Sequence, residues 1–114
     1  MIKSIAIRRL HVCIIKQAIN IEPKVASSFL LLGNIFKKLK ESSDAIQAYK
    51  QSTKIDSHFY QGYYNLALMF KDSSNLEEAL AYSRLTLLYN KQYQPGLMLY
   101  GEINEQLGEI GLAT

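Results

Sequence analysis

The side chains that most often catalyse reactions or bind metals are sparse in this sequence. It has one cysteine, Cys13, and two histidines, His11 and His58. These are too few for a structural zinc site, and a single cysteine excludes an intramolecular disulfide. No Ser/His/Asp or Cys/His set is persuasive, and no glycine-rich loop precedes a helix to hold a phosphate. We therefore expect no catalytic residues, no cofactor and no metal, and predict that the protein is not an enzyme.

Length and charge exclude further classes. The 114 residues are 48% hydrophobic and 20% charged, with a net charge of +3. This composition fits one globular domain at most. The charge is too small to argue for a nucleic-acid partner, and no run of eighteen apolar residues could cross a membrane. The absence of disulfides and of a convincing signal favours the cytoplasm. The basic, acid-free residues 1–21 leave a mitochondrial transit peptide as an alternative.

Apolar residues recur every three or four positions along the chain, which is the spacing of a buried helical face. Leu32, Ile35, Phe36 and Leu39 form one such stripe. The pattern predicts an all-α chain without strands. The predicted helices lie near 4–20, 25–39, 43–56, 59–72, 75–89 and 93–107, with a stub from 109. We expect Ser42 or Ser43, and Ser74 or Asn75, to cap the helices that follow them, and Cys13 to be a small buried apolar group.

The predicted helices repeat. A shift of 34 residues places Gly33 on Ala67 and Gly101, and Phe29 on Tyr63 and Leu97. Helix pairs repeated at a fixed period indicate a helical solenoid, in which each unit buries its apolar face against its neighbours. Small residues recur where the two helices of a pair cross closely, because only Gly or Ala fits there.

The residues at these positions resemble the tetratricopeptide repeat (TPR) family. One nearly complete unit is Phe29-Leu32-Gly33-Phe36-Ala45-Tyr49, and a second is Tyr63-Leu66-Ala67-Phe70-Ala79. The resemblance implies a right-handed solenoid of antiparallel helix pairs in one domain, 1–114. It divides the chain into the second helix of a partial repeat (1–24), two full repeats (25–58 and 59–92) and a partial repeat (93–114).

The resemblance also implies the binding site. In this family the first helix of each pair lines a concave face that holds a peptide or a helix of a partner protein. The positions of this sequence that would line it are Ser27, Leu30, Asn34, Lys37, Lys38, Gln61, Tyr64, Asn65, Leu68, Lys71, Met98, Glu102 and Glu105. Amides would bind the backbone of an extended peptide, and Leu30, Tyr64 and Met98 its apolar side chains. We therefore expect a non-catalytic protein-interaction scaffold.

Three alternatives remain open at this stage. The predicted face could be a solvated helical surface without a ligand. The chain could be the TPR arm of a larger enzyme, such as a glycosyl- or sulfotransferase-type protein. It could also be a structural homo-oligomer, because a stub after residue 109 would leave Leu97, Tyr100 and Ile103 incompletely covered, and solenoids with open ends expose apolar surface.

Overall fold

The computed structural model describes residues 2–109 and the side chains of residues 4–108. These residues form six helices and no strand, so the predicted all-α class is confirmed. Each predicted helix agrees with an observed one to within about two residues at either end. The stub predicted after residue 109 lies outside the described residues. The helices are α1 (Ile2–Ile21), α2 (Ala26–Lys38), α3 (Ser42–Ile55), α4 (Tyr60–Asp72), α5 (Leu76–Tyr89) and α6 (Gln94–Glu109).

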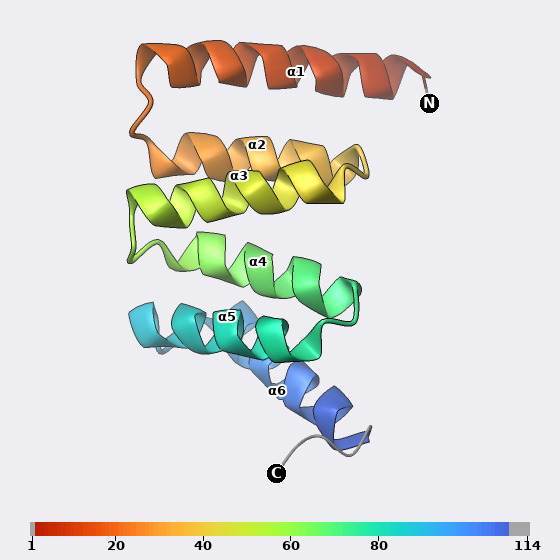
Figure 1. Cartoon of the computed structure of the whole chain (residues 1–114), viewed down its shortest axis with the longest axis vertical. Coiled ribbons are helices and arrows are strands. Elements are labelled where there is room, and N and C mark those ends of the chain that lie inside the picture. The colour runs from red at the N-terminus through yellow and green to blue at the C-terminus, as the bar shows by residue number, and fades with distance from the viewer. Residues whose placement is uncertain (1, 110–114) are drawn as a thin grey trace. The chain divides into compact units, whose positions relative to one another are not determined.

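The helices divide into two compact units, Met1–Ser57 and His58–Thr114. In the first unit, α2 and α3 lie side by side, and α1 runs along α2 (Figure 1). Val12 and Ile15 of α1 are buried, as are the predicted core residues Ile35, Phe36 and Ala45. Arg9 of α1 forms an ion pair with Glu41, just before α3. The predicted apolar stripes are therefore the surfaces through which these helices pack.

The closest approach of α2 to α3 occurs at Gly33. A Cβ atom built on Gly33 would lie 2.5 Å from Cε1 of Tyr49, so the ring rests directly on the helix backbone. Tyr49 is fully buried there, and its hydroxyl donates a hydrogen bond to Oδ1 of Asn34 at 2.6 Å. The smallest residue of α2 thus faces the largest buried residue of α3, which is the size complementarity that the repeat pattern predicts.

In the second unit, α4 and α5 form the corresponding pair. Tyr82 of α5 stacks between Tyr63 and Phe70 of α4, with ring centroids 6.3 and 5.5 Å away. Ala67 and Ser83 are both fully buried. They are equivalent to Gly33 and Tyr49 by the 34-residue shift, so here two small residues meet and the aromatic rings fill the space beside them.

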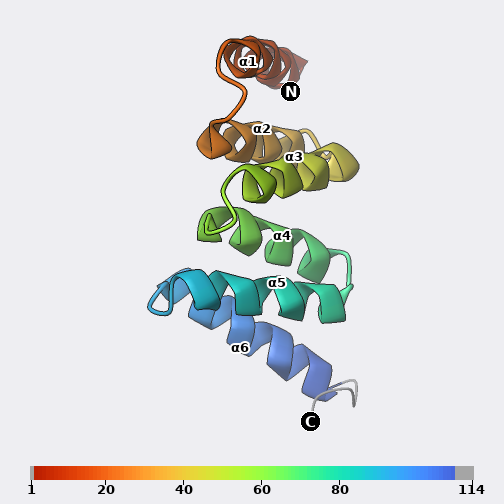
Figure 2. The same ribbon diagram turned by 60° about the vertical axis from the view of Figure 1, so that its left-hand side comes forward.

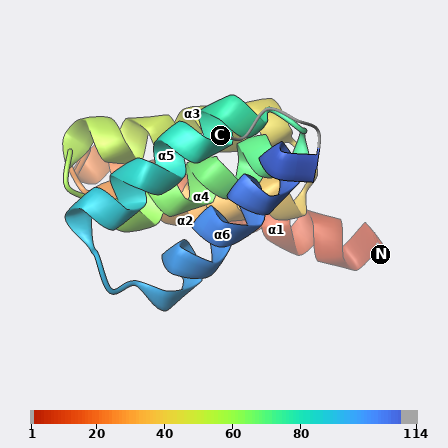
Figure 3. The same cartoon turned by 90° about the horizontal axis from the view of Figure 1, so that it is seen from below.

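Helix α6 is inclined to α5 and packs on it (Figures 2 and 3). Its buried side is Leu99, Ile103 and Leu107, spaced by four residues. The sequence predicts that Leu97, Tyr100 and Ile103 form the apolar strip of this helix that needs covering. Of these three residues only Ile103 is buried, since Leu97 is 42% exposed and Tyr100 is half-buried. Both sides of α6 carry apolar residues, and periodicity alone could not identify the packed one.

Three buried hydroxyl side chains satisfy themselves within their own helices. Ser52 and Ser83 donate to carbonyl oxygens three residues earlier, at 2.6 and 2.8 Å, and Thr86 donates to the one four residues earlier, at 2.9 Å. A buried hydroxyl costs free energy only when it lacks a hydrogen bond. Small polar residues can therefore be buried on α3, which packs on α2, and on α5, which packs on α4. They need no polar partner on the neighbouring helix.

The predicted side-chain caps of α3 and α5 are wrong. Both helices begin without a side-chain cap, at Glu41 and Asn75. The preceding helices instead end in backbone turns, in which Glu41 N donates to Phe36 O and Asn75 N to Phe70 O, at 2.9 and 2.8 Å. Lys40 and Ser74, 34 residues apart, both have φ of 65°. This is the Schellman arrangement, which satisfies the last carbonyls of α2 and α4 through a left-handed residue.

The left-handed residues predict a stabilising substitution. Lys40 and Ser74 are exposed, and only glycine adopts a positive φ without steric cost. We expect Lys40→Gly and Ser74→Gly each to raise the free energy of unfolding by about 0.5–1 kcal/mol in urea denaturation. The control Lys37→Gly, inside α2, should lower it by about 1 kcal/mol. A loss of stability in Lys40→Gly matching that control would contradict the assigned turn.

The two equivalent glycines should respond to alanine with opposite sign. Gly33→Ala places a methyl group against the Tyr49 ring, and overpacking of this kind costs about 1–3 kcal/mol. Gly101 has no atom within 4 Å of the position that an added methyl group would take, so Gly101→Ala should gain about 0.5–1 kcal/mol from helix propensity. Thermal unfolding followed by circular dichroism at low protein concentration measures both. Equal effects of the two substitutions would refute the close approach at Gly33.

Candidate functional site

Helix α4 presents a partly exposed stripe that matches the predicted binding face. Gln61, Tyr64, Leu68 and Lys71 are spaced at i, i+3, i+7 and i+10, which places them on one side of the helix. All four are intermediate in exposure, whereas Leu66 and Phe70 on the opposite side are buried. The stripe combines an amide, an aromatic ring, an aliphatic side chain and a cation that solvent or a ligand can reach.

Helix α6 extends this surface within the second unit. Nζ of Lys71 lies 3.1 Å from Oε2 of Glu102, so the ion pair joins the two helices. Met98, one turn before Glu102, is 65% exposed. Lys71, Glu102 and Glu105 border a small pocket of about 260 Å³. The structure therefore brings the α4 and α6 members of the predicted site together. We call this the α4–α6 face, made of Gln61, Tyr64, Leu68, Lys71, Met98, Glu102 and Glu105.

Three tyrosines cluster beside the α4–α6 face, namely Tyr64, which belongs to it, and its neighbours Tyr60 and Tyr93. The ring of Tyr93 meets Tyr60 and Tyr64 edge to face, with centroids 4.9 and 5.3 Å away. Burial, and then the neighbouring Tyr64 and Tyr60, raise the pKa of Tyr93 above its ordinary value. Edge-to-face packing fixes these rings, which lowers the entropy lost when they contact a ligand.

Two predicted asparagines are already engaged within the fold. Asn65 donates through Nδ2 to the carbonyl of Gln61 at 2.8 Å, one turn back in α4. Asn34 accepts the hydroxyl of Tyr49 through Oδ1. Both side chains therefore support their own helix pair with one amide atom, which the sequence did not indicate.

The remaining predicted residues lie on α2, in the first unit. Ser27, Lys37 and Lys38 are exposed, while Leu30 and Asn34 are intermediate. The carbonyl of Lys38 accepts a hydrogen bond from Nη1 of Arg8 at 3.3 Å, so the C-terminal end of α2 is also an anchor for α1. These five residues share the outward side of α2, as the spacing predicts.

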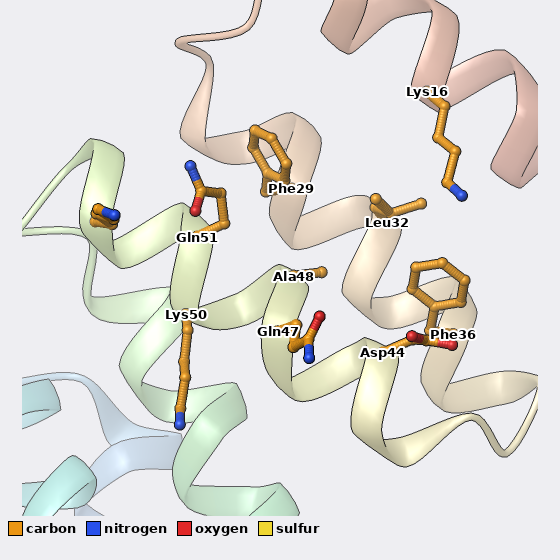
Figure 4. A pocket seen from close by; sticks show the side chains of 10 residues that line it. Lys16, Phe29, Leu32, Phe36, Asp44, Gln47, Ala48, Lys50 and Gln51 are labelled. Atoms are coloured by element: carbon orange, nitrogen blue, oxygen red, sulfur yellow. The ribbon is translucent and has the colours of Figure 1, made fainter.

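The first unit also contains a pocket that the sequence did not predict. It has a volume of about 640 Å³, and its lining side chains come from α1, α2 and α3 (Figure 4). The lining residues are Lys16, Phe29, Leu32, Phe36, Asp44, Gln47, Ala48, Lys50, Gln51 and Lys54. None of them belongs to the predicted site.

The lining of this pocket combines aromatic and apolar side chains with three lysines and one carboxylate. Lys16 points toward Phe36, with Nζ 5.8 Å from the ring centroid, within the range of a cation–π contact (Figure 4). Lys50 and Lys54 bring further positive charge from α3, against the single carboxylate of Asp44. One signal was present in the sequence, since Lys16 and Lys50 are equivalent by the 34-residue shift. The approach of Lys16 to Phe36 required the packing of α1 on α2.

The described residues contain no group of three His, Cys, Asp or Glu side chains placed to hold a metal ion. None of the helices described is long and apolar enough to cross a membrane. Cys13 is exposed, so the prediction of a buried apolar group is wrong. The preceding residue, Val12, is buried against the rest of the unit, but the packed side of α1 is narrow and does not include Cys13.

Comparison with known proteins identifies the class of fold. The chain is similar to two crystal structures of MamA, with TM-scores of 0.82 and 0.80 and 17% identity in each case. Both alignments cover 93% of this chain, but only 62% and 58% of the MamA chains. The chain therefore spans less than two thirds of these structures. No curated protein matches its sequence at a significant level. The fold defined by these likenesses is the helical-repeat solenoid.

The repeat itself is identified from sequence. Residues 26–59, which contain α2 and α3, match the family described as tetratricopeptide repeat. Residues 26–59 are therefore a tetratricopeptide repeat, as the residue pattern predicted for this part of the chain. A repeat of this kind in such a fold supports a scaffold for protein interactions in general.

Tyr49 predicts a loss of stability at alkaline pH. Burial raises the pKa of its hydroxyl from 10.0 to about 12, so the folded protein retains a proton that the unfolded chain loses. Its contribution to stability is complete below about pH 10 and is lost as the pH rises toward about 12, at no more than about 1.4 kcal/mol per pH unit. Urea midpoints should fall less steeply over this range in Tyr49→Phe than in the wild type. Identical slopes would show that Tyr49 is not buried.

Proposed function

We propose that this chain is a non-catalytic scaffold that holds a peptide or helix of a partner protein on the first-helix faces of its repeats. These faces are the α4–α6 face and the outward side of α2, with Ser27, Leu30, Asn34, Lys37 and Lys38. The tetratricopeptide match and the helical-repeat fold support this class of function. The proposal adds which surface acts and what kind of ligand it takes.

One observation carries the proposal. Tyr64, Leu68 and Met98 offer accessible apolar surface beside the Lys71–Glu102 ion pair. Protein-binding hot spots are typically a few aromatic or apolar side chains inside a polar rim. The rigid edge contact between Tyr64 and Tyr93 preorganises the aromatic part. A solvated helical face needs none of these features, which favours a ligand over the alternative of a bare surface.

The chemistry of the face restricts the ligand. An apolar side chain of the partner would pack between Tyr64 and Met98, and a polar backbone would run past Gln61. Lys71 and Glu102 already neutralise each other, so the centre of the face selects against a strongly charged ligand. Glu105, which is exposed, favours a lysine or arginine at one end of the ligand.

The proposal also includes the predicted repeat boundaries and the predicted location in the cell. We assign the repeats to 25–58 and 59–92, with partial repeats at 1–24 and 93–114, and place the protein in the cytoplasm. A larger enzyme of which this chain is the repeat arm would use the same faces to position a partner, so this alternative predicts the same binding residues. It differs only in what is attached to them.

A peptide library displayed on phage tests the proposal. Binders selected against the wild-type chain should lose affinity for Tyr64→Ala by about tenfold, which corresponds to about 1.4 kcal/mol. The matched control is Leu88→Ala, because Leu88 is 60% exposed on α5, outside the proposed surface. Binding to both variants is measured by isothermal titration of the selected peptides. Selected peptides that bind Tyr64→Ala and the wild type equally would overturn the α4–α6 face as the binding site.

A further inference from the structure

Helix α1 has a second apolar side that no described side chain of its own unit covers. Ile7, Leu10 and Ile14 are 53%, 58% and 54% exposed and lie at i, i+3 and i+7. Ile21, one further heptad along, is 82% exposed. The stripe continues onto α2 at Leu31, which is 51% exposed. An apolar stripe of this length on a helix surface is typical of an interface with another helix.

A groove runs beside this stripe. It has a volume of about 330 Å³ and lies between α1 and α2, where its walls are His11, Ile14, Ile15, Leu31 and Ile35. All but one of these side chains are aliphatic. The groove therefore suits the apolar side of a helix, with an imidazole as its only polar lining group.

Helix α6 has an exposed side on which a small residue, Gly101, leaves room for a neighbouring helix. Gly101 is exposed and has no atom within 4 Å of the position of an added Cβ, and Leu97, one turn earlier, is 42% exposed. The residue of α2 that is equivalent to Gly101 is Gly33, which is covered by Tyr49 of the paired helix α3. Helix α6 thus offers the same small-residue crossing point as α2, but without a partner helix on it among the described residues.

The charges of the two helices are complementary. Helix α1 contains four lysines and arginines and no acidic residue, whereas α6 contains three glutamates and no basic residue. Arg9 and Glu102 are each paired within their own unit, which leaves three basic side chains on α1 and two glutamates on α6 for this attraction. The units follow the same asymmetry. Residues 1–57 hold ten basic and four acidic side chains, and residues 58–114 hold three basic and six acidic ones. Opposite charge on two open apolar helices favours their association over self-pairing of either.

We propose that α6 of one copy of this chain docks on the exposed side of α1 of a second copy, and that the two helices form an intermolecular pair. The exposed stripe of α1 includes Ile7, Leu10 and Ile14, so this docking sets Gly101 and Leu97 of α6 against Ile14 and its neighbours in the stripe. The contact joins two different surfaces, so each copy retains one open face and the assembly grows head to tail. This goes beyond the proposed binding of a partner peptide.

Analytical ultracentrifugation of the full chain tests the docking. The weight-average mass should rise above 13.0 kDa as the protein concentration increases from about 10 μM to about 1 mM. It should fall when the salt concentration is raised from about 50 to about 500 mM, because screening weakens the attraction between α1 and α6. Gly101→Leu and Ile14→Glu should each weaken the association at least about tenfold. Leu88→Glu, on the exposed side of α5, should leave it unchanged.

Mixing the two impaired variants separates head-to-tail docking from symmetric pairing. Ile14→Glu keeps an intact α6, and Gly101→Leu keeps an intact α1, so the mixture should form a dimer that cannot extend. Its mass should stop at twice 13.0 kDa. Circular dichroism confirms that both variants remain helical. A wild-type mass that stays at 13.0 kDa throughout, or a mixture that stays monomeric while the wild type associates, would overturn the proposal.

Discussion

The contact of the Tyr49 ring with the backbone of Gly33 is the constraint on which the first unit depends. It sets how closely α2 and α3 approach, and it buries Tyr49, the largest fully buried side chain among the described residues. It also directs the Tyr49 hydroxyl to Asn34, on the outward side of α2. The packing of the helix pair and the polar surface that it presents are therefore linked through one side chain.

The second unit reaches the same helix pairing with different residues. Ala67 and Ser83 stand at the positions equivalent to Gly33 and Tyr49. The aromatic contact between the helices is made instead by Tyr82, which stacks with Tyr63 and Phe70. In both units the turn between the paired helices contains a left-handed residue, Lys40 or Ser74. The N–H of that residue donates to the carbonyl three residues earlier, and the next N–H donates to the carbonyl five residues earlier. The two helix pairs thus share the backbone geometry of their turns, and different residues fill the space between their helices.

The sequence predicted the fold well because helix periodicity and size complementarity are local and repeated. Gly33 and Ala67 could be recognised as crossing points from their register alone. The turns could not, since Lys40 and Ser74 adopt positive φ without being glycine, and nearby serines suggested side-chain caps. The buried side of α6 and the lysine-rich pocket depend on which helix packs where, as at Leu99 and Lys16. The positions of the proposed binding faces came from the family resemblance, with spacing within one helix in agreement, whereas the Lys71–Glu102 pair required two helices to meet.

The central claim is that accessible first-helix faces, and not the second helices, bind the partner. Amide NMR spectra of the isotopically labelled chain, recorded with and without a peptide selected on it, test this most directly. The claim predicts that the largest shift changes fall in the first helices, at residues 26–38, 60–72 and 94–105, and that they include Tyr64 and Met98. Changes confined to α3 and α5, with those residues unaffected, would contradict it.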